Sequence, residues 1–175
     1  MKHSKKTNRP AKFWPVMGFA TLAGMRSMSG PAFLSHCLAR QSPAGLIGSP
    51  LRLLRKPGVA TVLKVLAGGE MMADKLPNAP NRTAPPVLLG RVLSGALVGA
   101  AWYRSRDGSA LGGGLLGGLV AGAATFASYA LRTGISERAG VPVALVGVGE
   151  DALVLAGGAA LLRGQRPAQD HWRPM

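Results

Sequence analysis

The sequence predicts an all-α, polytopic membrane helix bundle. Of its 175 residues, 47% are hydrophobic and 25 are glycine, while 21 Lys and Arg and 7 Asp and Glu crowd into short islands between apolar runs. A transmembrane helix needs about 20 predominantly apolar residues, and several runs reach this length. We therefore predict one membrane domain, residues 13–163, rather than a soluble core.

The net charge of +14 would indicate nucleic acid in a soluble protein. Here much of it flanks apolar segments, where basic residues face the cytoplasm and anionic lipid. We expect the lipid bilayer and anionic head groups as partners, and no nucleic acid. Residues 1–12 are predicted to be a retained basic cytoplasmic tail, with a cleaved signal peptide as the alternative, because no clear small-x-small cleavage site follows. Residues 164–175 are predicted to be a polar C-terminal tail.

The first apolar segment, residues 13–39, is interrupted by Gly24, Arg26, Gly30 and Pro31. A Gly-Pro pair inside a helical run removes a backbone donor and favours a break. Two interpretations stay open. The segment is either one long, kinked span or a re-entrant pair of half-helices whose tips meet around residues 26–30.

Residues 40–56 mix four basic residues with leucines, which is typical of an interfacial amphipathic segment. A re-entrant first segment keeps these charges on the side of the basic N-terminus, so the positive-inside rule favours re-entry. Four further spans then place both termini inside. If the first segment crosses, the chain has five spans and its C-terminus lies outside.

The four further spans are predicted from the remaining apolar runs, residues 57–76, 84–103, 108–131 and 141–162. Glycines recur at every fourth position in two of them, and this spacing lets two helices approach closely. General glycine richness is the alternative explanation. The predicted packing residues are Gly95, Gly99, Gly114, Gly118 and Gly122.

Four of the seven acids lie within or at the end of an apolar segment. An acid at the bilayer centre costs about 2.5 to 3.5 kcal/mol on insertion scales, so these groups should meet basic residues in a shared polar interior. The predicted intramembrane cluster comprises Arg26, Ser27, Glu70, Asp74, Lys75, Arg91, Glu150 and Asp151.

Two functions fit such a cluster. The first is a small transporter or channel for a cation, a proton or a small polar solute. The second is a non-transporting structural or assembly protein in which buried ion pairs only fix helix packing. No nucleophile motif, phosphate loop or cofactor fingerprint is present, so we expect no enzyme, no cofactor and no metal site.

Five motifs stand out: GMRSMSGPAFLS (24–35), GEMMADKLPNAPNRTAPP (69–86), GRVLSGALVGA (90–100), the Gly-rich span ending SYALR (128–132) and ALVGVGEDALVLAGG (144–158). Together they resemble a bacterial inner-membrane family known as domain of unknown function 4126. The resemblance covers about residues 17–162 and implies a multi-pass protein of the bacterial inner membrane, but no established activity. A homo-oligomer stays open. The family's hallmark polar residues would be Arg26, Ser27, Glu70, Asp74, Lys75, Pro77, Arg82, Thr83, Arg91, Arg132, Glu150 and Asp151.

Overall fold

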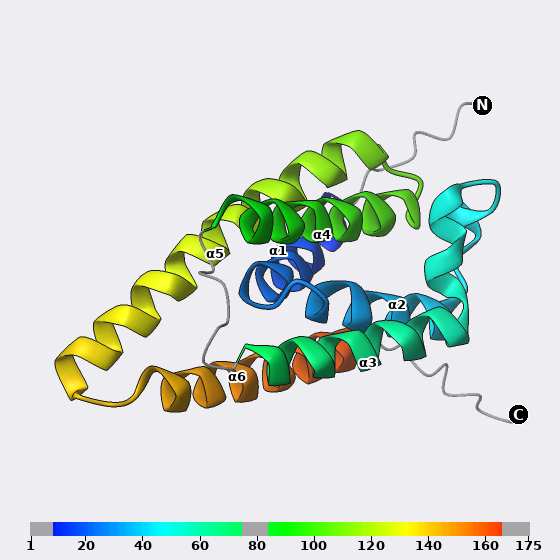
Figure 1. The fold of residues 1–175 in the computed structure, drawn as a ribbon. Helices are drawn as coiled ribbons and strands as arrows, with labels where there is room; N and C mark the ends of the chain where they lie inside the picture. The colour runs from blue at the N-terminus through cyan, green and yellow to red at the C-terminus, as the bar shows by residue number, and fades with distance from the viewer. Residues whose placement is uncertain (1–8, 75–83, 166–175) are drawn as a thin grey trace, which may run out of the picture.

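The computed structural model describes residues 9–74 and 84–165, and it is all-helical over these residues (Figure 1). The prediction of an all-α fold is therefore confirmed. The elements are α1 (Arg9–Met25), α2 (Ser29–Gln41), the short 3₁₀ helices η1 (Ala44–Leu46) and η2 (Pro50–Arg55), α3 (Pro57–Ala73), α4 (Pro85–Arg104), α5 (Ala110–Ala139) and α6 (Val143–Gly164).

Three helices, α4, α5 and α6, are long and apolar enough to cross a membrane. Large hydrophobic side chains stay exposed on their outer faces, including Leu93, Leu115 and Leu153, as expected for surfaces that meet lipid. The predicted span 57–76 forms α3 instead, which has 17 residues and is about 25 Å long. A transmembrane helix needs about 17 to 25 residues, so α3 is at the lower limit of this range, and within the described residues a fourth full span is not confirmed.

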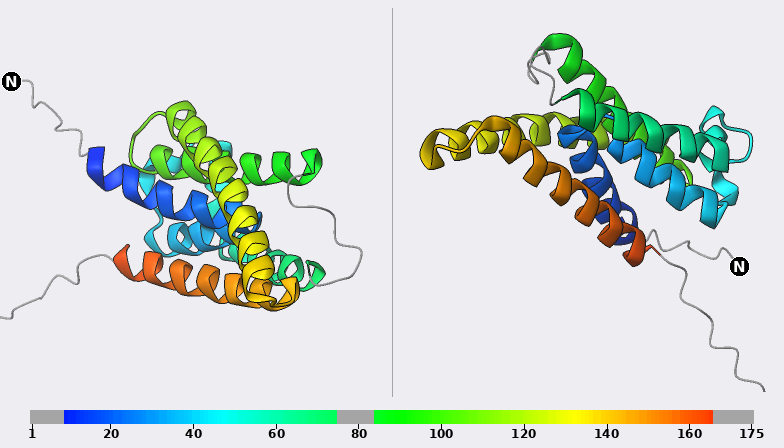
Figure 2. Two further views of the ribbon diagram at one scale, coloured as in Figure 1. Left: turned by 90° about the vertical axis from the view of Figure 1, so that its left-hand side faces the viewer. Right: turned by 60° about the horizontal axis from the view of Figure 1, so that its bottom comes forward.

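The first apolar segment is broken into two helices, as its Gly-Pro pair predicts. Residues 26–28 separate α1 from α2, and the two helices fold back on each other (Figure 2). A continuous helix would press the ring of Pro31 against the carbonyl of Ser27. A Cβ at Gly30 would lie 2.6 Å from the Phe19 carbonyl oxygen, so glycine permits the close crossing of α1 and α2.

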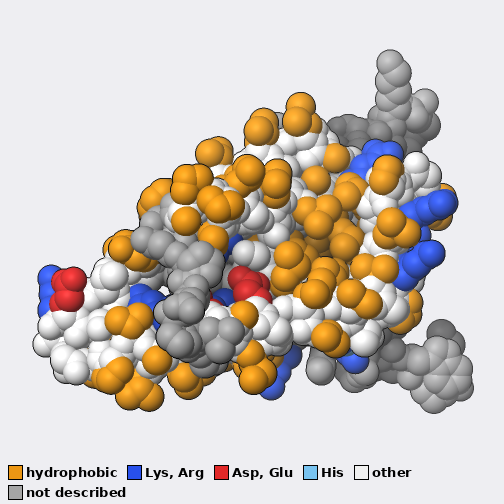
Figure 3. Space-filling model, viewed as in Figure 1, with side chains coloured by type: hydrophobic (Ala, Val, Ile, Leu, Met, Phe, Trp, Pro, Cys, Tyr) orange, Lys and Arg blue, Asp and Glu red, His pale blue; other side chains and the backbone are white. Residues whose placement is uncertain are grey.

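The start of α1 and the end of α6 lie at the same end of the bundle as η1 and η2. The Gln41 side-chain amide donates to the Gln165 carbonyl, and Gly45 packs on the backbone of Arg104. We name this the basic end, because basic side chains gather there (Figure 3). Its exposed members are Arg40, Arg52, Lys56, Arg104 and Arg163.

The segment predicted to be interfacial and amphipathic, residues 40–56, forms η1 and η2 rather than one regular helix. Leu46 and Leu54 are buried in the core, whereas Ile47 and Leu53 are exposed. This segment therefore packs against the bundle and also presents an apolar outer surface.

The closest helix pair is α4 with α5, as the glycine spacing predicts. Gly95 and Gly99 lie in the contact, and a Cβ on Gly99 would come within 1.9 Å of the Gly113 carbonyl oxygen. A Cβ on Gly117 would lie 2.1 Å from the Gly95 oxygen. Backbone therefore packs directly on backbone.

The tightest contact on α5 lies on a second glycine stripe, one residue before the predicted one. A Cβ at Gly114, Gly118 or Gly122 would reach its nearest neighbour on α4 only at 3.5 Å, which is ordinary van der Waals contact. These three glycines therefore face α4 at ordinary contact distance, and the closest backbone contact is made by Gly113 and Gly117, which the prediction does not name. The reason is that α5 carries two adjacent small-residue stripes, and spacing alone does not choose between them.

Candidate functional site

The break between α1 and α2 leaves backbone groups without helical partners, and the carboxylate of Glu70 on α3 satisfies two of them. Its Oε1 accepts a hydrogen bond from the Ser27 amide at 2.7 Å, and its Oε2 accepts one from the Met28 amide at 2.8 Å. A negative charge at a helix N-terminus is also favoured by the helix dipole. Glu70 thus caps the start of α2.

The end of α1 is held in a complementary way. The Gly24 carbonyl oxygen accepts from Arg91 Nη1 of α4 at 3.0 Å and from Thr125 Oγ1 of α5 at 2.9 Å. Both side chains are buried. An interrupted helix at membrane depth is tolerated only where such partners replace the missing backbone bonds. Side chains from three other helices therefore stabilise the break.

Arg26 lies in the break itself, and it starts a closed circuit of opposite charges. Its Nη1 lies 2.7 Å from Asp74 Oδ2, and its Nη2 lies 2.7 Å from Asp151 Oδ1. The same Asp74 oxygen lies 3.1 Å from Arg132 Nη1, which in turn lies 3.8 Å from Glu150 Oε2. Because Glu150 and Asp151 are neighbours on α6, the circuit closes. We name these five residues the charged ring.

The charged ring joins the α1–α2 break to α3, α5 and α6. Along α6, Asp151 lies about 20 Å from Gly164 at the basic end and about 12 Å from Val143 at the other end. The Arg26 side chain is fully buried, whereas the other four are 8–15% exposed. Figure 3 shows acidic side chains that reach the surface near the middle of this face. The ring is therefore an interior feature with an edge at the surface.

The predicted cluster residues fall into three groups. Four of them lie in the charged ring, and three lie at the break: Glu70, Ser27 through its amide, and Arg91. Lys75 lies outside the described residues. Asp74 and Asp151, from two apolar segments far apart in the sequence, therefore both contact Arg26 of the first apolar segment.

The predicted cluster omits two residues that the structure places here, Arg132 and Thr125. The sequence indicates an apolar span ending at residue 131, which would leave Arg132 at a solvated helix end. Helix α5 instead continues to Ala139 and ends at Gly140, whose φ is 64°. A glycine at this position is a common helix stop, and it was the available signal that Arg132 lies inside the helix. No local signal distinguishes Thr125 from other helical threonines.

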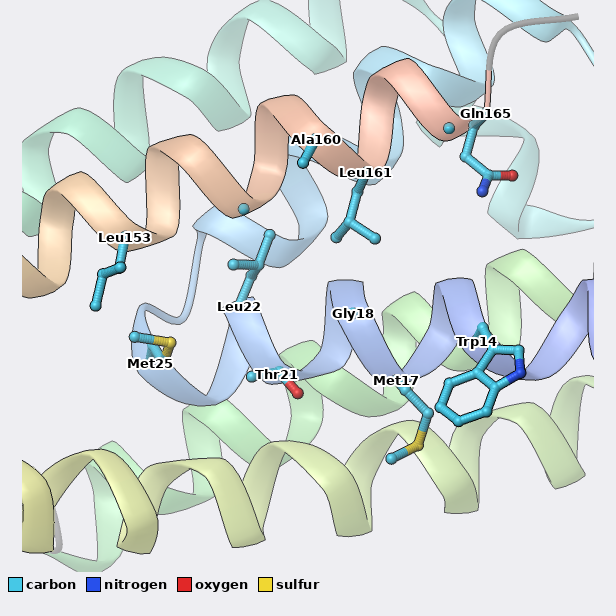
Figure 4. A pocket seen from close by; sticks show the side chains of 12 residues that line it. Trp14, Met17, Gly18, Thr21, Leu22, Met25, Leu153, Ala160, Leu161 and Gln165 are labelled. Atoms are coloured by element: carbon cyan, nitrogen blue, oxygen red, sulfur yellow. The ribbon is translucent and has the colours of Figure 1, made fainter.

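Other sites are less suited to polar chemistry. A search of the residues that the structure describes finds no group of three His, Cys, Asp or Glu side chains that could hold a metal ion. A groove between α1 and α6 is lined mainly by apolar side chains, among them Leu22 and Leu161 (Figure 4). The charged ring with the capped break is therefore the candidate site.

Comparisons of the chain with protein-family models, curated proteins and solved structures gave no match. The resemblance to the inner-membrane family accordingly stays a prediction, and the case for a function rests on the geometry of the site.

Proposed function

We propose that this chain is a multi-pass protein of the bacterial inner membrane that transports a cation, a proton or a small polar solute past the charged ring. The proposal rests on one observation: the break between α1 and α2 lies next to buried side chains of opposite charge. Discontinuous helices that present backbone ends to a polar interior are how many transporters build their sites. Ionisable groups at membrane depth also favour a functional role by default.

The orientation in this proposal follows from the basic end. Five exposed basic residues gather there, and cytoplasmic loops carry an excess of Lys and Arg. The basic end would then face the cytoplasm, with the start of α1 and the end of α6 on the same side. The α1–α2 pair would enter from the cytoplasm and return, while the charged ring would lie nearer the outer face.

A second function is favoured by a different observation. Both guanidinium groups of the ring contact two carboxylates each, so the ring also has the form of an internal lock. In that case it would fix the packing of the bundle and move nothing. Burying an ion pair adds little stability on its own, but losing one partner of it is costly.

Glu150 offers the sharpest test between the two functions. Its contact with Arg132, at 3.8 Å, is the longest ion pair of the ring, and Glu150→Gln removes the charge while keeping the shape of the side chain. The purified chain would be reconstituted in vesicles with a pH-sensitive dye and, separately, with a potassium-sensitive dye. Glu137→Gln is the matched control, because Glu137 is exposed near the end of α5.

Transport predicts a proton or potassium flux in the unmodified chain that Glu150→Gln reduces at least tenfold and Glu137→Gln leaves unchanged. Both variants should keep the melting temperature of the parent. If the unmodified chain gives no flux with either dye, or if Glu150→Gln conducts as well as the parent, transport of these ions is rejected. Loss of folding in Glu150→Gln would instead favour the lock.

A further inference from the structure

Helices α2 and α3 pack side by side and bring three basic side chains together on their outer surface. Lys64 Nζ of α3 lies 2.9 Å from His36 Nδ1 of α2. Arg40 lies one helical turn after His36 on the same face of α2. None of the three forms an ion pair with an acid in the described part of the chain.

The hydrogen-bonding chemistry of this group is one-sided. A lysine ammonium can only donate, so Nδ1 of His36 accepts from Lys64 and the imidazole proton is on Nε2. Arg40 also has donors only. The group therefore offers free N–H groups and no free acceptor. A ligand that fits it must bring several acceptor oxygens and negative charge, as a phosphate does.

The surroundings of the basic group indicate that a phosphate bound there would belong to a lipid and not to a soluble molecule. Lys64 lies about 10 Å along α3 from Pro57 at the basic end, and Arg40 is next to the last residue of α2. On α3, Val65 next to Lys64 is exposed, and Val62 and Leu66 are exposed on the outer face of the helix, about 160° around from Lys64. A phosphate at the basic group would thus have acyl chains next to it, on apolar side chains.

We propose that His36, Arg40 and Lys64 form a binding site for the phosphate of an anionic phospholipid. The three side chains bind the head group, and the exposed face of α3 receives its acyl chains. The inference rests on the location of the chain in a membrane and not on transport. The flux measurement and the lipid measurement can therefore fail independently.

Native mass spectrometry of the full chain in detergent tests the site, with phosphatidylglycerol and phosphatidylcholine as separate additions. In the proposed site Lys64 and Arg40 each donate directly to the phosphate, and a net contribution of about 1 kcal/mol from such a bond corresponds to about fivefold in affinity. We expect preferential binding of phosphatidylglycerol, and a loss of about fivefold in Lys64→Gln and in Arg40→Gln. Both residues are exposed, so the variants should keep the melting temperature measured without lipid.

The matched control is Arg52→Gln, because Arg52 is exposed on η2 at the same basic end. It should bind phosphatidylglycerol as the parent does. Glycerol phosphate is the third addition and should not compete at the concentrations at which the lipid binds. The inference is overturned by equal binding of the two lipids, by an equal loss in Arg52→Gln, or by effective competition from glycerol phosphate.

Discussion

Replacement of Gly99 by alanine should separate α4 from α5. The added Cβ would lie 1.9 Å from the Gly113 carbonyl oxygen, whereas such C···O contacts are normally no shorter than about 3.3 Å. The helices would have to move apart by about 1.4 Å. Overpacking usually costs about 1–3 kcal/mol, and we expect the upper end of this range because the obstacle is backbone and cannot rotate away.

Gly114→Ala is the matched control, because its Cβ would meet nothing closer than the Ala96 carbonyl oxygen at 3.5 Å. Alanine is also the better helix former by up to about 1 kcal/mol. This variant should therefore equal or exceed the parent in stability. Reversible unfolding in mixed micelles with increasing dodecyl sulfate measures both changes. Equal losses in the two variants, or a Gly99→Ala protein as stable as the parent, would refute the packing described for this pair.

Three further predictions concern the break and the ring. Glu70→Ala should speed hydrogen exchange at the Ser27 amide and lower the unfolding free energy by about 1–3 kcal/mol, because two amides lose their acceptor. Exchange at the parent rate would contradict the role of Glu70 as a cap. Thr125→Val should lower the unfolding free energy by about 1 kcal/mol in the same assay. The control Thr133→Val removes only an exposed hydrogen bond within α5 and should change little. Equal effects of the two variants would reject the role of Thr125. Arg132→Gln should cost up to about 3–5 kcal/mol, because the buried Glu150 and the partly buried Asp74 each lose a cationic neighbour. A neutral outcome would place Arg132 outside the ring.

The sequence was informative where the signal is local. Gly30 and Pro31 predict the break because a proline excludes a helical hydrogen bond wherever the chain goes. The acids of α3 and α6 are conspicuous because lipid penalises them. Neither argument specifies which groups cap the broken ends. That Glu70 rather than Asp74 reaches the α2 amides depends on how α3 packs beside α2, and local sequence does not encode this.

The parts that the sequence did not predict depend on helix length and on rotation about the helix axis. Hydrophobicity ends before helix α5 does, so the apolar pattern alone does not place Arg132 in the cluster, and only the family resemblance names it. The sequence does not indicate that Gly113 and Gly117, rather than Gly114 and Gly118, make the tightest contact on α5, because the two glycine stripes differ only by a rotation of about 100°. The rotation of α5 about its axis is set by its contact with α4, in which the carbonyl oxygens of Gly95 and Gly99 pack directly on the backbone of Gly117 and Gly113.

The account depends most on the ring, and a double-mutant cycle on Arg26 and Asp151 tests it directly. Their guanidinium and carboxylate lie 2.7 Å apart, with Arg26 fully buried. Arg26→Gln and Asp151→Asn should each lower the unfolding free energy by about 3–5 kcal/mol, and the double variant should lose less than the sum by more than about 1 kcal/mol. Losses that add to within about 0.5 kcal/mol would show that the two residues do not interact, and the ring would then have to be abandoned.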